Sequence, residues 1–427
     1  MAVALIVLLR RRLGTFLHPC LLLGGFFVVY GLCGYLLYPL VYSHGPTPLR
    51  SSVSGGGASI GSEAELRALM AFTLFGLAPL LIAAALSRPV RTGRNLRIDF
   101  GERPAVVRWG VMAFLFVVAV AFLAGVDLHS LFHRYGYQEF SGGNQEAYRL
   151  GNGLLIPAIL VAWTLALSQR ASPFERTFGF AAVILFAFFD LATASRGLAL
   201  FPLLFLLAFS LTRGRLPSMK VIVPGVAVAL LLFAAALFLR TLPEQGMSPY
   251  LHALINDPST VFTSKIPQAG ANVLGGFQNS AKVMAEAQNV NLHTLWSSIN
   301  PLPRSTQGAD PTLAYRFTSY MPFSTVGMLG RIAIPIGFAF YLLLALAINW
   351  LWEIGHRTVS RATLVEPVLL GMSLIVALMS IQYQLRTTAR VATFALLLVA
   401  ILLVGFHLRE REPDTGPASR RLPTPVA

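Results

Sequence analysis

Residues 105–126 read AVVRWGVMAFLFVVAVAFLAGV, an apolar run whose only charged side chain is Arg108, near its start. A helix of about 20 mostly apolar residues is long enough to cross the hydrocarbon core of a bilayer. This run therefore predicts a membrane-spanning helix, and the rest of the chain repeats its pattern.

The composition of the whole chain agrees with this prediction. Of its 427 residues, 55% are hydrophobic and 12% are charged, whereas about 25% of the residues of a typical soluble domain are charged. Runs of about 17 to 25 mostly apolar residues are the mark of spanning helices. They predict an all-α membrane protein with ten spans, at residues 20–42, 66–87, 105–126, 154–168, 178–194, 198–212, 221–239, 332–352, 367–383 and 391–407.

The basic residues that give the chain its net charge of +15 lie mainly in short loops between the apolar runs. In a soluble chain such a charge would suggest nucleic-acid binding, but here the retention of Lys and Arg on the cytoplasmic side of a membrane explains it. We therefore exclude nucleic acid as a partner. Placing both termini in the cytoplasm puts twenty of the 33 basic residues on that side, and this count predicts the orientation.

The chain divides into four regions. Residues 1–240 hold the first seven predicted spans, and residues 326–408 hold the last three. Between them, residues 241–325 form one large loop that the orientation places outside the membrane. A structureless loop of this length is uncommon, so we expect a partly helical cap with an amphipathic stretch at 272–286. Residues 409–427, rich in Pro, Arg and Glu, are expected to be a disordered cytoplasmic tail.

Six arginines are predicted to lie at the outer ends of spans, against the bias that retains positive charge inside. A guanidinium group can bind phosphate or carboxylate through two parallel hydrogen bonds. A set of them at the outer surface therefore predicts a site for an anionic ligand such as a lipid pyrophosphate. For any one of them, snorkelling to lipid headgroups or pairing with an acid is the alternative. The six are Arg149, Arg196, Arg240, Arg331, Arg386 and Arg390.

The segment ASRGL at residues 194–198 joins two predicted spans with almost no loop. This short turn holds Arg196 at the interface with little freedom, and Gly197 permits the tight reversal. Asp190 lies inside the preceding span, and an intramembrane carboxylate is either part of a functional site or the partner of an Arg. Both interpretations of Asp190 stay open, because a separation of six residues does not place it on the face of Arg196 in a straight helix.

The large loop contains a rigid element that places a basic residue ahead of an acid. The segment NPLPR at residues 300–304 ends in Arg304 and is followed by Asp310 and Arg316. No Asp-x-Asp pair and no phosphate-binding glycine loop occur in the sequence. We therefore expect neither a metal ion nor a cofactor.

Four short segments carry a resemblance to a known family: the His18-Pro19 start of the first long span, residues 193–198, residues 301–304, and residues 330–337 at the start of the eighth span. With the ten predicted spans and one large outer loop late in the chain, they resemble the oligosaccharide repeat-unit polymerases of the O-antigen polymerase (Wzy) type. The resemblance implies a C-type glycosyltransferase-like membrane fold. It also implies a reaction at the periplasmic face of the bacterial inner membrane, in which a glycan passes from one polyprenyl pyrophosphate onto another lipid-linked repeat unit.

We therefore expect a metal-independent glycan polymerase. Its partners would be undecaprenyl-pyrophosphate-linked oligosaccharide and membrane lipids, with a chain-length regulator and a flippase of the same pathway as further partners. The six outer arginines would bind the donor pyrophosphate and stabilise charge on the leaving group, and Arg304 and Arg316 would close the site. Asp310 is the first candidate for the base that removes the acceptor proton, with Asp190 and Glu244 after it.

Two other functions remain open. An O-antigen ligase shares the donor and the general architecture but delivers the glycan to a lipid A core, and an essential His252 or His293 in the large loop would favour it. A lipid-linked oligosaccharide flippase or other transporter would need polar residues along the mid-membrane faces of its helices, where Asp190 is the one acid that the sequence predicts.

Overall fold

The computed structural model describes residues 7–9, 18–43, 62–86, 99–135 and 143–285 of the chain, together with the single positions Ala347, Thr393, Leu396, Leu397 and Ala400. These residues form helices and connecting turns, and no β-strand occurs among them. The prediction of an all-α protein is thereby confirmed for the described part of the chain. The last three predicted spans, at residues 332–352, 367–383 and 391–407, lie outside that part apart from the single positions.

Within the described part of the chain, four helical segments are apolar and long enough to cross a bilayer. The protein is therefore embedded in a membrane. The four segments are α2 (Pro19–Ser43), α5 (Ala105–Gly125), α9 (Leu200–Arg213) with the short 3-10 helix η2 (Arg196–Ala199) ahead of it, and α10 (Met219–Leu239).

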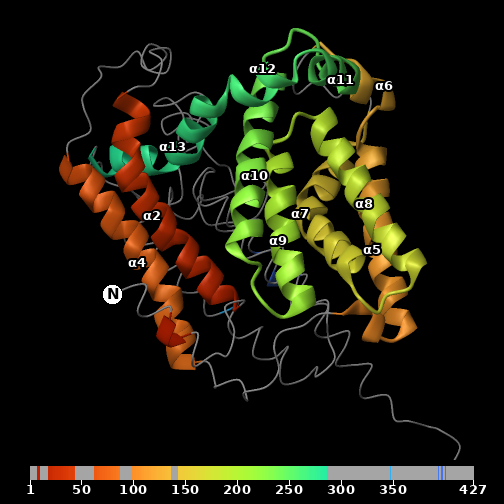
Figure 1. The fold of residues 1–427 in the computed structure, drawn as a ribbon, viewed down its shortest axis with the longest axis horizontal. Helices are drawn as coiled ribbons and strands as arrows, with labels where there is room; N and C mark the ends of the chain where they lie inside the picture. Colours follow the sequence, from red (N-terminus) through yellow and green to blue (C-terminus); the bar gives the residue numbers. More distant parts are fainter. Residues whose placement is uncertain are drawn as a thin grey trace, which may run out of the picture.

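Among the described helices, the main bundle consists of α5, α7 (Gln145–Leu167), α8 (Pro173–Ala192), α9 and α10, which stand side by side (Figure 1). Helix α7 lies against α5, α8 and α9, and its Leu160 and Leu165 are fully buried. In contrast, Trp109 and Phe116 on α5 are more than half exposed. Large apolar side chains on an outer face suit contact with lipid, because a surface of this kind would promote aggregation in water.

Helices α2 and α4 (Ser62–Leu86) form a second unit beside the bundle. They cross where Gly24 meets Gly76, since a Cβ atom added to Gly24 would lie 2.5 Å from the carbonyl oxygen of Gly76. Small residues commonly permit such close helix crossings in membranes. The Tyr30 hydroxyl of α2 donates a hydrogen bond of 2.6 Å to the carbonyl oxygen of Val273, and Val273 belongs to α13 (Ile266–Ala285). Because α13 also contacts α10, it links this pair to the main bundle.

Three short helices lie together at one end of the bundle, shown at the top of Figure 1: α6 (Leu128–Phe132), α11 (Met247–Asn256) and α12 (Pro258–Thr263). The carboxylate of Asp127 accepts a hydrogen bond from the N–H of Ser130 at the start of α6, and Asp257 caps α12 in the same way. Residues 241–285 of the predicted large loop therefore contain α11, α12 and α13. Residues 286–325 lie outside the described part.

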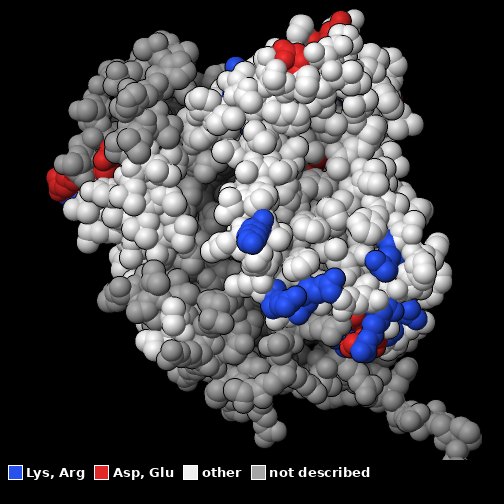
Figure 2. All heavy atoms as spheres, viewed as in Figure 1, with Lys and Arg blue, Asp and Glu red and all other residues white. Residues whose placement is uncertain are grey.

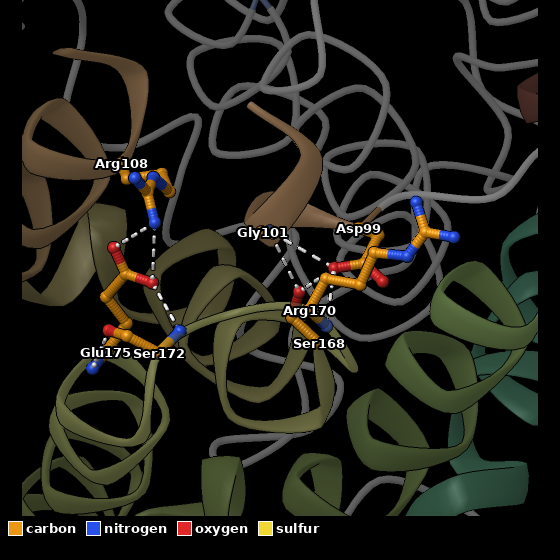
Figure 3. A network of polar contacts seen from close by, with 7 residues as sticks. All are labelled: Asp99, Gly101, Arg108, Ser168, Arg170, Ser172 and Glu175. Atoms are coloured by element: carbon orange, nitrogen blue, oxygen red, sulfur yellow. Dashed lines mark hydrogen bonds and ion pairs between the residues drawn. The ribbon is translucent and has the colours of Figure 1, made fainter. Parts of the chain in front are cut away.

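At the opposite end, the chain before α5 is joined to the turn between α7 and α8 by buried polar contacts (Figure 3). Asp99 precedes the 3-10 helix η1 (Phe100–Glu102), and its carboxylate accepts hydrogen bonds from the N–H of Gly101 at 3.1 Å and of Arg170 at 3.2 Å. The Ser168 hydroxyl donates to the same carboxylate oxygen. This carboxylate therefore holds together two segments that are far apart in the sequence.

A second contact at this end joins α5 to α8. The Nη1 atom of Arg108 lies 2.9 Å from an oxygen of the Glu175 carboxylate, and Figure 3 shows the two side chains pointing toward each other. Glu175 also accepts a hydrogen bond of 2.8 Å from the N–H of Ser172, whose hydroxyl accepts one from the N–H of Glu175. This reciprocal pair is a capping box, which satisfies backbone donors at the start of α8.

The two ends of the bundle differ in charge. Figure 2 shows most of the Lys and Arg side chains of this face gathered toward the end away from α11 and α12. The basic residues near the turns of that end are exposed, which suits contact with water or with anionic headgroups. They are Arg170, Arg176, Arg213, Arg215 and Lys220.

Candidate functional site

The candidate site is the turn between α8 and α9, at the end of the bundle where α11 and α12 lie. Helix α8 ends at Ala192, after which the N–H of Ser195 donates to the carbonyl of Asp190 at 2.7 Å. The N–H of Ala194 donates to the carbonyl of Leu191 at 2.8 Å. These two bonds are the pattern of a Schellman motif, which satisfies the last carbonyls of a helix and reverses the chain.

The motif requires a left-handed backbone at Ala194, which has a φ of +45°. Glycine is the usual residue at this position because a Cβ atom makes the left-handed conformation costly. Ala194 is fully buried and packs against Tyr250 of α11 and Val261 of α12. Its methyl group therefore contributes to the packing between the turn and the short helices above it.

The chain then enters η2 without any intervening loop. Ser195 is the N-cap of η2, and its hydroxyl accepts a hydrogen bond of 3.0 Å from the N–H of Gly197. Ser195 is thus held on both sides, by its backbone N–H to α8 and by its side-chain hydroxyl to η2. Arg196, the first residue of η2, is consequently positioned by a well-ordered turn.

Arg240 holds the turn from the neighbouring helix. It is the C-cap of α10, and its Nε atom donates a hydrogen bond of 2.8 Å to the carbonyl oxygen of Ala194. A hydrogen bond from a charged donor is stronger than a neutral one. Arg240 therefore supports the conformation of the turn that carries Arg196.

Arg196 is half-buried, and its guanidinium carbon lies 5.9 Å from the centre of the Phe233 ring of α10. At this distance the face of an aromatic ring attracts a cation. The Nε atom of Arg196 is buried and has no hydrogen-bond partner within the described part of the chain. One face of the guanidinium is thus supported by a ring, while one of its donors is unused.

Asp190 is buried, with 2% of its surface exposed. Its Oδ2 atom has no hydrogen-bond partner among the described residues. The carboxyl group lies against Gly197, because a Cβ atom added to Gly197 would be only 3.0 Å from both the Cγ and the Oδ1 atoms of Asp190. Asp190 therefore reaches across the turn to the residue that follows Arg196.

No family model, curated protein or solved structure matches this chain. The chemical capability of the turn is therefore inferred from its own geometry. A cation and a carboxyl group lie at one turn, each with an unused polar atom, and the described residues contain no ion pair between them. Such a turn can bind a ligand that carries both an anionic group and a hydrogen-bond donor.

The structure brings together two of the six arginines that the sequence singles out. Arg196 and Arg240 both lie at this turn, with Asp190 beside them. Arg149 lies near the start of α7, but its side chain is outside the description. The remaining predicted site residues also lie outside the described part, so their roles stay predictions: Arg304, Asp310, Arg316, Arg331, Arg386 and Arg390.

The other predicted candidates from the large loop are exposed or lie outside the described residues. Glu244 is exposed in the connection between α10 and α11, and His252 is exposed on α11. His293 lies outside the described part. The described residues contain no group of three His, Cys, Asp or Glu side chains that could hold a metal ion. Metal independence stays a prediction for the whole chain.

A buried polar network near the same end was not predicted from the sequence. Arg134 donates from Nη1 to the carbonyl of Ser130 at 3.1 Å and from Nη2 to the hydroxyl of Tyr250 at 3.4 Å. The Tyr250 hydroxyl donates in turn to the Oε1 atom of Gln245, whose backbone pairs with that of Arg134. Gly246, with a φ of +111°, permits the close approach. The network fixes α11 over the bundle.

Proposed function

We propose that this chain is a metal-independent membrane glycosyltransferase that polymerises polyprenyl-pyrophosphate-linked oligosaccharide repeat units. The observation that carries the proposal is the guanidinium of Arg196, which is held in a hydrogen-bonded turn and whose buried Nε donor has no partner within the described residues. Phosphate oxygens are the acceptors that such a group binds most strongly. The complete fold in this proposal is a C-type glycosyltransferase-like arrangement of ten spans.

The charge difference between the two ends supports a location for the site. Lys and Arg are retained on the cytoplasmic side of membrane proteins, so the end with Arg170, Arg213 and Arg215 would face the cytoplasm. The turn with Arg196 would then lie at the periplasmic face of a bacterial inner membrane. Both termini would be cytoplasmic, in agreement with the count of basic residues along the chain.

In the proposed reaction, Arg196 binds the pyrophosphate of the donor lipid and stabilises the negative charge that develops on it. An acceptor hydroxyl attacks the anomeric carbon of the donor glycan, and the bond from that carbon to the pyrophosphate oxygen breaks. The acceptor proton passes to a carboxylate, for which Asp310 is the proposed base. Arg240 contributes by holding the carbonyl of Ala194 and with it the turn that carries Arg196.

The test is complementation of a deletion strain, with surface polysaccharide separated on a gel. The wild-type chain should restore a ladder of polymer, and Arg196→Ala should give product with a single repeat at an unchanged level of membrane-inserted protein. Arg215→Ala is the matched control, because Arg215 is exposed at the opposite end of the bundle, and it should restore the full ladder. Arg196→Lys retains the charge but lacks the planar fork, so it should restore only short chains.

Other outcomes would overturn the proposal. A normal ladder from Arg196→Ala would show that Arg196 does not bind the donor. Accumulation of lipid-linked polymer in the deletion strain would indicate a ligase, and the absence of any periplasmic glycan would indicate a flippase.

A further inference from the structure

Two buried polar atoms at the same turn have no hydrogen-bond partner among the described residues. The Oδ2 atom of Asp190 is an acceptor, and the Nε atom of Arg196 is a donor. Within the described residues neither satisfies the other, because no ion pair joins the two side chains. A buried polar group left without a hydrogen bond is unfavourable, so its presence in a folded protein calls for an explanation.

The space around Gly197 shows how Asp190 could be reached. The backbone at Gly197 is not left-handed, since Ala194 is the left-handed residue of this turn. A glycine is instead required at residue 197 for lack of space, because any side chain there would overlap the carboxyl group of Asp190. Gly197 is only half-buried. The carboxyl group of Asp190 therefore lies directly against the backbone of a half-buried glycine.

Hydrogen bonds of the turn also fix the backbone that carries these two side chains. Asp190 is anchored by its own carbonyl, which accepts from the N–H of Ser195 at 2.7 Å, and Arg196 follows directly in η2. Arg240 adds a further hydrogen bond, from its Nε atom to the carbonyl oxygen of Ala194. Groups held in place before a ligand arrives lose less entropy when it binds. The arrangement suits a ligand whose own groups have a defined spacing.

We propose that Asp190 accepts a hydrogen bond from a hydroxyl group of a phosphorylated headgroup whose phosphate is bound by Arg196. The carboxylate accepts the hydroxyl proton in a hydrogen bond, and the guanidinium donates to phosphate oxygens. For the polymerase of the preceding section, on which this assignment of the ligand rests, the hydroxyl belongs to the sugar attached to the pyrophosphate. The same chemistry is offered by the glycerol headgroup of phosphatidylglycerol. Asp190 is thus a specificity residue that distinguishes a headgroup with a hydroxyl from a bare phosphate.

The experiment uses the full-length chain in phosphatidylcholine nanodiscs. Binding is measured for three probes: polyprenyl diphosphate, polyprenyl-diphospho-N-acetylglucosamine and phosphatidylglycerol. The wild-type chain should bind the sugar-bearing lipid about tenfold more tightly than the bare diphosphate, which corresponds to one hydrogen bond to a charged group. Asp190→Ala should bind the two diphosphates equally, whereas Arg196→Ala should weaken both.

Two further variants separate this role from an effect on folding. Asp190→Asn keeps the shape of the side chain and one acceptor oxygen, so it should retain part of the preference for the sugar. Ser210→Ala is the matched control, because Ser210 is also buried in a span and its hydroxyl donates to the carbonyl of Leu206 in its own helix. This control should leave the preference unchanged.

The outcomes distinguish this proposal from the proposed function. A preference for the sugar that persists in Asp190→Ala would overturn the role of Asp190 while leaving the polymerase intact. If binding depends on Asp190 only for phosphatidylglycerol, and not for the sugar-bearing lipid, the site at Asp190 and Arg196 would stand but the proposed polymerase function would not. Equal binding of all probes by the wild-type chain would overturn both.

Discussion

The Nε atom of Arg240 lies 2.8 Å from the carbonyl oxygen of Ala194, and this hydrogen bond joins the end of α10 to the end of α8. The carbonyl that it binds belongs to the one non-glycine residue of the described chain with a positive φ. Arg240 thus supports the turn at the residue whose backbone conformation is least favourable. The stability of the turn and the position of Arg196 depend on each other through this contact.

We predict that Arg240→Ala lowers the free energy of unfolding by about 1–3 kcal/mol, because a buried carbonyl loses a charged hydrogen-bond donor. The measurement is the midpoint of thermal unfolding of the purified chain in detergent. Arg215→Ala removes an exposed guanidinium at the opposite end and should leave the midpoint unchanged. Equal midpoints for the two variants would contradict a supporting role of Arg240.

Ala194 provides a second test, because its methyl group is buried while its φ is +45°. Ala194→Gly relieves the backbone but removes a buried methyl group, and the two effects of about 1 kcal/mol each should nearly cancel. Ala194→Val adds a branched side chain at the same backbone conformation and should destabilise the fold by at least about 2 kcal/mol. A midpoint for Ala194→Val as high as that of Ala194→Gly would show that the backbone is not left-handed there.

The contact between Gly197 and Asp190 predicts non-additive substitutions. Gly197→Ala places a methyl group against the Asp190 carboxyl group and should destabilise the turn by about 1–3 kcal/mol. The double variant Gly197→Ala with Asp190→Ala should regain part of this loss, because the added methyl group then occupies vacated space. A double-mutant cycle on the unfolding midpoints measures the coupling, and strict additivity would show that the two residues are not in contact.

Two serines at helix starts form a matched pair at the opposite end. Ser172 caps α8 with its side chain, whereas Ser218 stands at the N-cap of α10 without a side-chain hydrogen bond. Ser172→Ala should therefore cost about 1 kcal/mol of stability and Ser218→Ala close to nothing. Both variants are compared with the wild-type chain by thermal unfolding. Similar losses from the two would contradict the capping box.

Acid should weaken α12 through its capping residue. The Thr260 side chain, the N–H of Thr260 and the Ser259 hydroxyl hold the pKa of Asp257 below its ordinary value of 3.8. Because the pKa is lower in the folded chain, the stabilisation is complete above the pKa of the unfolded chain and is lost as the pH falls through the folded value. The difference in unfolding midpoint between the wild-type chain and Asp257→Ala should therefore shrink as the pH falls below 3.8. Asp257→Ser keeps a cap that does not titrate, so its difference from Asp257→Ala should not change with pH.

The spanning helices could be predicted from the sequence because hydropathy is a local property. The predicted spans at 105–126 and 221–239 correspond to α5 and α10 within two residues at each end. Helix α8 begins at Pro173, five residues before its predicted span. Its first turn carries Glu175 and Arg176, and these charged residues lower the hydropathy so that the turn falls outside the predicted span. The capping box and the contact with Arg108 nevertheless make the turn helical.

The candidate site could be predicted only in part. The sequence predicts a short turn at Arg196 and Gly197 between two apolar runs, and the structure places both residues there. The contact of Asp190 with this turn could not be predicted, because on a straight helix the side chains of Asp190 and Arg196 would point to different faces. The chain reverses after Ala192, and the reversal brings the Asp190 carboxyl group against Gly197.

The polarity and order of the spanning helices follow from the amino acids of each segment alone, since burial of apolar side chains in lipid needs no particular neighbour. Local sequence does not predict two other features of the structure, the contact of Arg134 with Tyr250 and the hydrogen bond from Arg240 to Ala194. Arg134 is 116 residues from Tyr250 and Arg240 is 46 residues from Ala194, so these pairs meet only when the helices pack. A hydrogen bond requires two atoms at a particular distance and angle, and that geometry comes from the packing of the whole bundle.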